Sequence, residues 1–400
     1  MLRIGIVATH PIQYQAPWFR ALAARREVDL TIYYCLLPDS EQQGAGFGVD
    51  FQWDVPLLEG YRYEVLGNIA AHPGLGTFFG CDTPDIGPKL RTGLFDAVII
   101  LGWGVKSYLQ ALRSCRRSGT PAIARGESNA MRPRPIHMRL IHRVLLSQFS
   151  AFLTIGRSNE EFYRANGVPS RKLFGAPYCV DNERFGREAD ILEPQRNDLR
   201  AQWGISPTAY TFLFCAKFID KKRPTDVLEA LARALTEARP GSSPLHLLMV
   251  GDGELRRACE GRARDSRLPV SFTGFLNQAR IAEAYVASDC LVLPSDYGET
   301  WGLVVNEAMA CGRPAIVSDR VGCHLDLVRP ETGSVFLFGD IDALAQDLAR
   351  FASDPAASRD KGSQARKLIQ QISVPRLVEA TLRAARGLTP TAPTQTQTQC

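Results

Sequence analysis

Two glutamates stand near a strand-to-helix junction in the second half of the chain. Glu299 lies in a glycine-punctuated loop after the apolar run 290–293, and Glu307 lies about a turn and a half into the helix expected next. In open α/β sheets, ligands bind where the carboxyl ends of strands meet helix N-termini. Free backbone N–H groups near residues 300–303 would suit an anion such as pyrophosphate. The alternative is an N-cap region with incidental carboxylates, in which Glu299 only favours the helix dipole.

Two lysines occupy a similar junction earlier in the chain. Lys217 ends the apolar run 211–216, and Lys222 follows in the short loop before a helical pattern. A lysine at the end of a buried strand is costly to bury without an anionic partner. The two ammonium groups could neutralise a departing diphosphate, or they could form a solvated basic turn.

The elements that must position these residues alternate between short apolar runs and helical patterns. This alternation is typical of βαβ units and a parallel sheet. We expect strands at 3–8, 29–35, 97–101, 122–125 and 151–155, and then at 211–216, 245–250, 270–273, 290–293, 314–318 and 334–337. The polar stretch 187–198 separates the two series. The pattern therefore predicts an α/β protein with two tandem, doubly wound, Rossmann-like domains.

The expected domain boundaries follow from the same pattern. We expect an N-terminal domain over 1–185, a linker over 186–207 and a C-terminal domain over 208–374. A helix over 375–388 is expected to return to the N-terminal domain. Residues 389–400 contain only Thr, Pro, Ala and Gln with a terminal Cys, and this low apolar content predicts a disordered tail.

Composition excludes several classes of protein. The chain has 400 residues, 45% of them hydrophobic, and no apolar run approaches the length of a membrane-spanning helix. Its 10 cysteines form no C-x-x-C pair, which disfavours a zinc ribbon or a secreted disulfide framework and predicts a reducing cytoplasm. A dinucleotide-binding oxidoreductase is also disfavoured, because Gly251-Asp-Gly253 lacks the third glycine of its fingerprint.

In combination, the two junctions resemble those of the family 4 retaining glycosyltransferases, group 1 glycosyl transferases with the GT-B fold. In that family, seven residues separate a loop Glu from a helix Glu, and a strand-terminal Arg or Lys precedes a second Lys by five residues. Glu299, Glu307, Lys217 and Lys222 have these spacings. Further matches are the segments 250–254, 272–275, 294–295 and 180–185.

The resemblance implies roles for residues on both sides of a cleft. Lys217 and Lys222 would bind the donor diphosphate, Glu307 the ribose hydroxyls and Glu299 a hydroxyl of the donor sugar. The other residues expected to contact the donor are Gly251, Phe275, Gly298, Thr300, Trp301, Gly302 and Leu303.

The first half departs from the family pattern. No glycine pair follows the first strand, where His10 stands, and the sequence Arg125-Gly-Glu127 replaces a histidine usual after a middle strand. We take His10 and Arg125 as catalytic candidates, although His10 could equally be a structural histidine.

The implied function is transfer of a sugar, of hexosyltransferase type, from a UDP- or GDP-linked donor with retention of configuration. The acceptor would be a sugar, a lipid-linked sugar or a small molecule, in the synthesis of a bacterial-type envelope polysaccharide or glycoconjugate. No metal or other cofactor is expected, because the lysines and helix terminus would replace a divalent ion. No nucleic-acid partner is expected either. A non-catalytic nucleotide-sugar-binding or regulatory protein of the same fold is the alternative.

The net charge of +5 is concentrated in one region. Residues 101–150 hold one Lys and eight Arg against one acid, Glu127. From Ile136 the pattern alternates basic and apolar positions at helical spacing. Such a helix could lie on the anionic inner face of the plasma membrane. Alternatively, Met138, Leu140, Ile141, Val144 and Leu145 are mostly core, with the arginines as a solvated rim.

Overall fold

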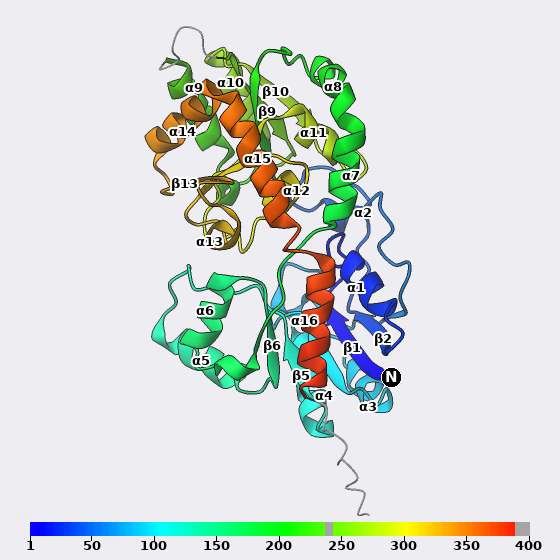
Figure 1. The fold of residues 1–400 in the computed structure, drawn as a ribbon. Coiled ribbons are helices and arrows are strands. Elements are labelled where there is room, and N and C mark those ends of the chain that lie inside the picture. The colour runs from blue at the N-terminus through cyan, green and yellow to red at the C-terminus, as the bar shows by residue number, and fades with distance from the viewer. Residues whose placement is uncertain (237–242, 389–400) are drawn as a thin grey trace, which may run out of the picture.

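Two parallel sheets, each covered by helices, make up the protein in its computed structural model, which describes residues 1–236 and 243–388 (Figure 1). The N-terminal sheet has the strand order β3-β2-β1-β4-β5-β6-β7, and the C-terminal sheet has the order β10-β9-β8-β11-β12-β13. Every neighbouring pair is parallel. Strand order therefore reverses between β1 and β4 and again between β8 and β11, which confirms two doubly wound units in the GT-B arrangement.

The N-terminal sheet forms around the first series of apolar runs. Its strands are β1 (Leu2–Ala8), β2 (Val28–Tyr34), β3 (Tyr63–Val65), β4 (Ala97–Ile100), β5 (Ala122–Ala124), β6 (Ala151–Thr154) and β7 (Leu173–Gly175). Its helices are α1 (Ala16–Ala23), α2 (Ser40–Gly44), α3 (Ile86–Thr92), α4 (Lys106–Ser118), α5 (Ile136–Leu146) and α6 (Arg157–Ala165). The short strands β3 and β7, which the sequence did not predict, form its two edges.

The C-terminal sheet forms around the second series. Its strands are β8 (Tyr210–Cys215), β9 (Leu245–Val250), β10 (Val270–Gly274), β11 (Cys290–Leu293), β12 (Ala315–Ser318) and β13 (Gly333–Phe336). The helices of this half are α7 (Asn182–Leu192), α8 (Arg196–Gln202), α9 (Pro224–Thr236), α10 (Arg256–Asp265), α11 (Ile281–Ala287), α12 (Leu303–Ala310), α13 (His324–Leu327), α14 (Ile341–Ser353) and α15 (Pro355–Ile369).

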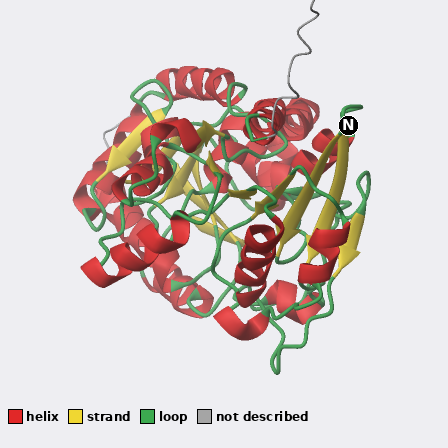
Figure 2. Cartoon of the chain, turned by 90° about the horizontal axis from the view of Figure 1, so that it is seen from below, coloured by secondary structure: helices red, strands yellow, loops and turns green. Residues whose placement is uncertain are grey.

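Each sheet has a hydrophobic core on both faces, and Figure 2 shows the strands inside a coat of helices. Alternate side chains of one strand enter different cores because successive residues point to opposite faces. In β1, Ile4 and Ile6 enter one core and Val7 enters the other. This two-sided burial explains why the strands read as continuous apolar runs.

The last described helix, α16 (Val374–Arg386), packs on the N-terminal sheet although the preceding helix, α15, belongs to the C-terminal half (Figure 1). Leu377, Val378 and Leu382 are buried in the same core as Trp18 and Phe19 of α1. The expected tail, 389–400, lies outside the described residues.

Two segments differ from what the sequence suggested. The stretch expected as a linker, 186–207, is largely helical, with α7, a short 3-10 turn and α8. In α5, Met138, Leu140, Ile141 and Val144 are exposed and only His142 and Leu146 are buried. The interpretation of these four apolar residues as mostly core is therefore wrong, because no other element in the described part of the chain covers their side of the helix.

Candidate functional site

The predicted donor residues gather where the strands of the C-terminal sheet end. Lys217 follows β8 and Glu299 follows β11, and these strands are neighbours across the reversal of strand order. Gly251 follows β9, and Phe275 follows β10. Because all strands of the sheet run parallel, their carboxyl ends meet at one edge, which is where ligands of such sheets bind.

Lys222 and Glu299 form an ion pair within this edge. The Lys222 ammonium contacts the Oε2 atom of Glu299, and the two side chains are only 16% and 14% exposed. The hydroxyl of Ser295 also donates to this carboxylate, at 3.4 Å. The ion pair therefore places a cation next to a carboxylate. An anion that enters the site could bind the Lys222 ammonium, and a hydroxyl group could donate to the Glu299 carboxylate.

Lys217 has a different environment, because no carboxylate in residues 1–236 or 243–388 forms an ion pair with it. Its ammonium donates to the carbonyl oxygen of Ala45 at 2.6 Å and lies 4.3 Å from the centre of the Phe47 ring. Burial lowers the pKa of Lys217, and the nearby charges of Lys221 and Lys222 lower it further. A partly buried cation held only by a carbonyl and a ring would gain strongly from a phosphate oxygen.

The segment that contacts Lys217 comes from the N-terminal half, where the chain after α2 crosses to the C-terminal half (Figure 1). The rings of Phe47 and Phe51 lie 5.0 and 4.2 Å from that of Phe275, centre to centre. The side-chain amide of Asn277 donates to the carbonyl of Gln52 at 2.7 Å. Residues from both halves therefore line the place predicted for the nucleotide.

Glu307 lies in α12 and is 8% exposed. The hydroxyl of Tyr285 donates to its Oε2 atom at 2.6 Å. Burial raises the pKa of Glu307 to about 7, although Tyr285 and the charge of Arg184 oppose the shift. A carboxyl group with a pKa near 7 can accept hydrogen bonds from hydroxyl groups once it loses its proton.

The start of α12, where backbone N–H groups were expected to bind an anion, requires a glycine. Gly302 caps the helix with φ of 101°, and a Cβ there would lie 2.9 Å from a methyl group of Val321, so only glycine fits. Leu303 is the first helical residue. The Trp301 indole is buried and donates to Asn306 at 2.9 Å. The N–H of Gly298 is bonded to the Asp296 side chain.

Gly251 lets two strand ends approach closely. Its φ is 125°, and a Cβ would lie 2.0 Å from the carbonyl oxygen of Ala216. Its N–H donates to the carbonyl of Gly274 at 2.9 Å. This glycine therefore shapes the edge of the sheet next to Lys217.

Glu127 is a residue of this site that the sequence reasoning did not select. Its Oε2 atom accepts from the Thr300 hydroxyl at 3.1 Å, and its Oε1 atom accepts from the Tyr178 hydroxyl at 2.6 Å. Burial raises the pKa of Tyr14, and the charges of Glu127 and Glu299 contribute to the shift, which places both carboxylates around one phenol. The available signal was that Glu127 is the single acid of the basic region 101–150.

The two catalytic candidates from the first half, Arg125 and His10, lie in buried or partly buried positions. Arg125 is 7% exposed, donates to the carbonyls of Ala176 and Pro177, and lies against the rings of Trp18 and Tyr178. Burial lowers the pKa of His10 to about 4, so its ring is neutral at pH 7, and its Nδ1 atom bonds to the neighbouring Thr9 hydroxyl. Among the described residues, neither side chain contacts Lys217, Glu299 or Glu307.

No group of three or more His, Cys, Asp or Glu side chains placed to hold a metal ion occurs in residues 1–236 and 243–388. The one D-x-D motif of the chain, Asp340-Ile-Asp342, acts as a helix cap. Asp340 precedes α14 and accepts from the N–H of Ala343 at 2.9 Å.

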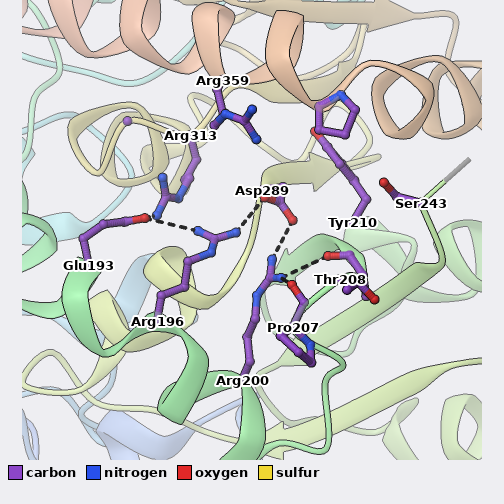
Figure 3. Close-up of a pocket in the computed structure, with 13 residues that line it drawn as sticks. Glu193, Arg196, Arg200, Pro207, Thr208, Tyr210, Ser243, Asp289, Arg313 and Arg359 are labelled. Atoms are coloured by element: carbon purple, nitrogen blue, oxygen red, sulfur yellow. Dashed lines mark hydrogen bonds and ion pairs between the residues drawn. The ribbon is translucent and has the colours of Figure 1, made fainter.

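A polar cavity of about 500 Å³ lies near α8 and the start of β8, away from the predicted residues (Figure 3). Arg196 and Arg200 both bind Asp289 there, at 2.6 and 2.7 Å. They also donate to carbonyl groups at the C-terminal end of α11. Their guanidinium groups thus fasten the expected linker to the C-terminal domain, a structural role.

The sequence of this chain is similar to sequences of known glycosyltransferases. The family "Glycosyl transferases group 1" matches residues 195–368. A GDP-mannose-dependent alpha-(1-6)-phosphatidylinositol dimannoside mannosyltransferase of Mycobacterium tuberculosis is 30% identical over 185 residues, 45% of this chain and 43% of that protein. The N-acetyl-alpha-D-glucosaminyl L-malate synthase of Bacillus anthracis is 31% identical over 209 residues, 51% of each chain. The chain thus spans about half the length of these relatives.

Solved structures resemble this chain over almost its full length. A glycosyltransferase from Rickettsia africae superimposes with a TM-score of 0.73 at 12% identity, covering 98% of this chain and 99% of the other. HepE of Anabaena, in complex with UDP, gives a TM-score of 0.70 at 15% identity, covering 97% and 100%. At such identities the likeness establishes the fold.

Proposed function

We propose that this chain, whose residues 195–368 match the family of group 1 glycosyl transferases, moves a sugar from a nucleotide-sugar donor to an acceptor with retention of configuration. The observation that carries the proposal is the grouping of Lys217, Lys222, Glu299 and Glu307 at one edge of the C-terminal sheet. One relative is GDP-mannose-dependent and one structural neighbour holds UDP, which supports a UDP- or GDP-linked donor.

The donor would bind with its diphosphate between the two lysines. Lys217 would exchange the Ala45 carbonyl for a phosphate oxygen, a stronger, charge-assisted partner. The backbone N–H groups after Gly302 would add to the positive field. Glu307 would accept the ribose hydroxyls and Glu299 a hydroxyl of the sugar, which releases Lys222 toward the diphosphate.

Transfer would then depend on stabilisation of the leaving group. The bond between the anomeric carbon and the diphosphate breaks, and the acceptor oxygen bonds to that carbon on the same face. The acceptor proton passes to the departing phosphate oxygen. The lysines and the helix start would stabilise the charge that develops on the diphosphate. We propose that this arrangement needs no metal ion.

Glu127 would act on the acceptor side of the reaction. Glu127 is exposed and accepts a hydrogen bond from the Thr300 hydroxyl of the C-terminal domain. Its charge and that of Glu299 both raise the pKa of Tyr14. We propose that Glu127 positions an acceptor or sugar hydroxyl. The acceptor would be a sugar, a lipid-linked sugar or a small molecule of a polysaccharide or glycoconjugate pathway.

We further propose that the enzyme acts in the cytoplasm, in peripheral contact with the inner face of the plasma membrane. Nothing in residues 1–236 or 243–388 forms a helix with the length and apolar character needed to cross a bilayer.

A nucleotide-sugar screen with product analysis tests the function. A true donor at a hundred times its Kd adds about 2.7 kcal/mol to stability and raises Tm. The product, or the sugar released by hydrolysis of the donor, should retain the donor's anomeric configuration by NMR, and Glu299→Ala should bind the donor but turn it over slowly. Inverted product would refute retention, and binding without turnover by the unmodified protein would indicate a non-catalytic nucleotide-sugar-binding protein.

A further inference from the structure

Helix α5 presents an apolar face that no described residue covers. It lies at the side of the N-terminal domain, next to α6 (Figure 1). Ile136, Leu140, Ile141 and Val144 are 75%, 60%, 55% and 66% exposed, and we call these four residues the α5 face. With 3.6 residues per turn, they point away from the side that buries His142 and Leu146.

Cations border the α5 face without paired acids. Arg139 and Arg143 lie one turn apart along one edge of the face, and Arg132 stands in the loop before the helix. All three are exposed, and none forms an ion pair with a described residue. No Asp or Glu occurs between Glu127 and Glu160. The face is therefore an apolar strip beside uncompensated positive charge.

Arg134 differs from these three arginines. Its guanidinium donates to the carbonyl of Asn129 at 2.6 Å and lies 4.6 Å from the centre of the Phe162 ring. It holds the loop before α5 against α6. A test of surface charge should leave Arg134 unchanged.

We propose that the α5 face docks on an anionic phospholipid surface. Its apolar side chains would enter the boundary between headgroups and acyl chains, and Arg132, Arg139 and Arg143 would contact lipid phosphates. The charge pattern favours lipid over a second copy of this chain, because two such faces would bring the same arginines together with no acid between them.

The α5 face is linked to the candidate site by the loop before the helix. The loop 128–135 joins Glu127 to the start of α5, and the side-chain amide of Asn129 in this loop donates to the carbonyl of Thr300 at 3.3 Å. Docking would therefore hold the acceptor side of the cleft near the lipid headgroups. The purpose of the surface rests on the proposed function, whereas its binding to lipid does not.

Vesicle flotation of the full chain tests the proposal. Vesicles of phosphatidylcholine alone are compared with vesicles that contain a quarter phosphatidylglycerol, at low salt and at 1 M NaCl. The wild-type protein should float with the anionic vesicles at low salt only. Arg139→Ala/Arg143→Ala should weaken binding about twenty-five-fold, since each cation near the surface contributes about fivefold.

Leu140→Glu/Val144→Glu should abolish flotation, because charge replaces half of the apolar face. Leu337→Glu is the matched control, since Leu337 is as exposed as Val144, at 66%, but lies in the C-terminal domain. All variants change exposed side chains and should keep the wild-type Tm. Flotation that ignores lipid charge, or that survives both double substitutions, would overturn the proposal.

Self-association is the competing outcome. If Leu140→Glu/Val144→Glu converts a dimer to a monomer in sedimentation and leaves vesicle binding unchanged, the face joins two copies and the lipid proposal is wrong. Thermal shifts with UDP- and GDP-sugars, measured without vesicles, report the proposed function separately. Flotation without any such shift in Tm would support the docking surface and contradict the proposed donor site.

Discussion

Replacing Glu307 with glutamine tests the electrostatics of the proposed donor site through protein stability. Burial raises the folded-state pKa of Glu307 from 4.5 to about 7. Its protonated form therefore favours folding. The stabilisation is fully present below pH 4.5 and is lost as pH rises through about 7. A shift of this size corresponds to about 3 kcal/mol at most, of which about 2 kcal/mol falls between pH 5.5 and 8.5.

The assay is urea unfolding of wild type and Glu307→Gln at pH 5.5 and 8.5. Glutamine keeps an oxygen for the Tyr285 hydroxyl but cannot ionise. The wild type should lose about 2 kcal/mol relative to the variant between the two pH values. Glu331→Gln, at an exposed position, should follow the wild type. If the free energies of unfolding of wild type and Glu307→Gln change equally with pH, the raised pKa of the buried Glu307 carboxyl group is refuted.

The same variant links stability to function. Loss of a charged acceptor for the ribose hydroxyls should weaken donor binding about tenfold to a hundredfold. In the wild type, donor affinity should rise with pH through about 7, as Glu307 loses its proton. Donor affinity that is equal in wild type and variant, and flat with pH, would remove Glu307 from the ribose site.

Three further predictions concern the remaining groups of the cleft. Lys217→Ala should lose about tenfold to a hundredfold in affinity for a nucleoside diphosphate but little for the nucleoside, by calorimetry, because only the diphosphate needs the cation. The exposed Lys367→Ala is its control, and equal losses for both ligands would make Lys217 structural. Glu127→Gln should raise the acceptor KM or lower kcat by at least tenfold while donor Kd is unchanged, and a wild-type rate would contradict its acceptor role. Activity should survive EDTA, and loss that Mg²⁺ or Mn²⁺ restores would show that a metal is required.

The sequence alone determined the architecture of the protein. Continuous apolar runs that alternate with helical patterns leave few options except parallel sheets buried on both faces, as Ile4, Ile6 and Val7 of β1 illustrate. The spacing of Lys217, Lys222, Glu299 and Glu307 predicted a donor site at the strand ends, because strand ends and helix starts can be recognised from local sequence. That these residues bind a donor stays a prediction. The edge strands β3 and β7 were missed, since three residues carry too little periodicity.

Only the tertiary structure decided which residues from the first half face this site. Arg125 and Glu127 are two residues apart, yet Arg125 is buried against Trp18 and Tyr178 while Glu127 reaches Thr300 in the other half of the chain. Local sequence contains no information about a contact across 173 positions. The same holds for α5, whose pattern fits either a core or a surface helix. Its apolar residues are exposed because no other described element packs against that face, a property of the assembled chain.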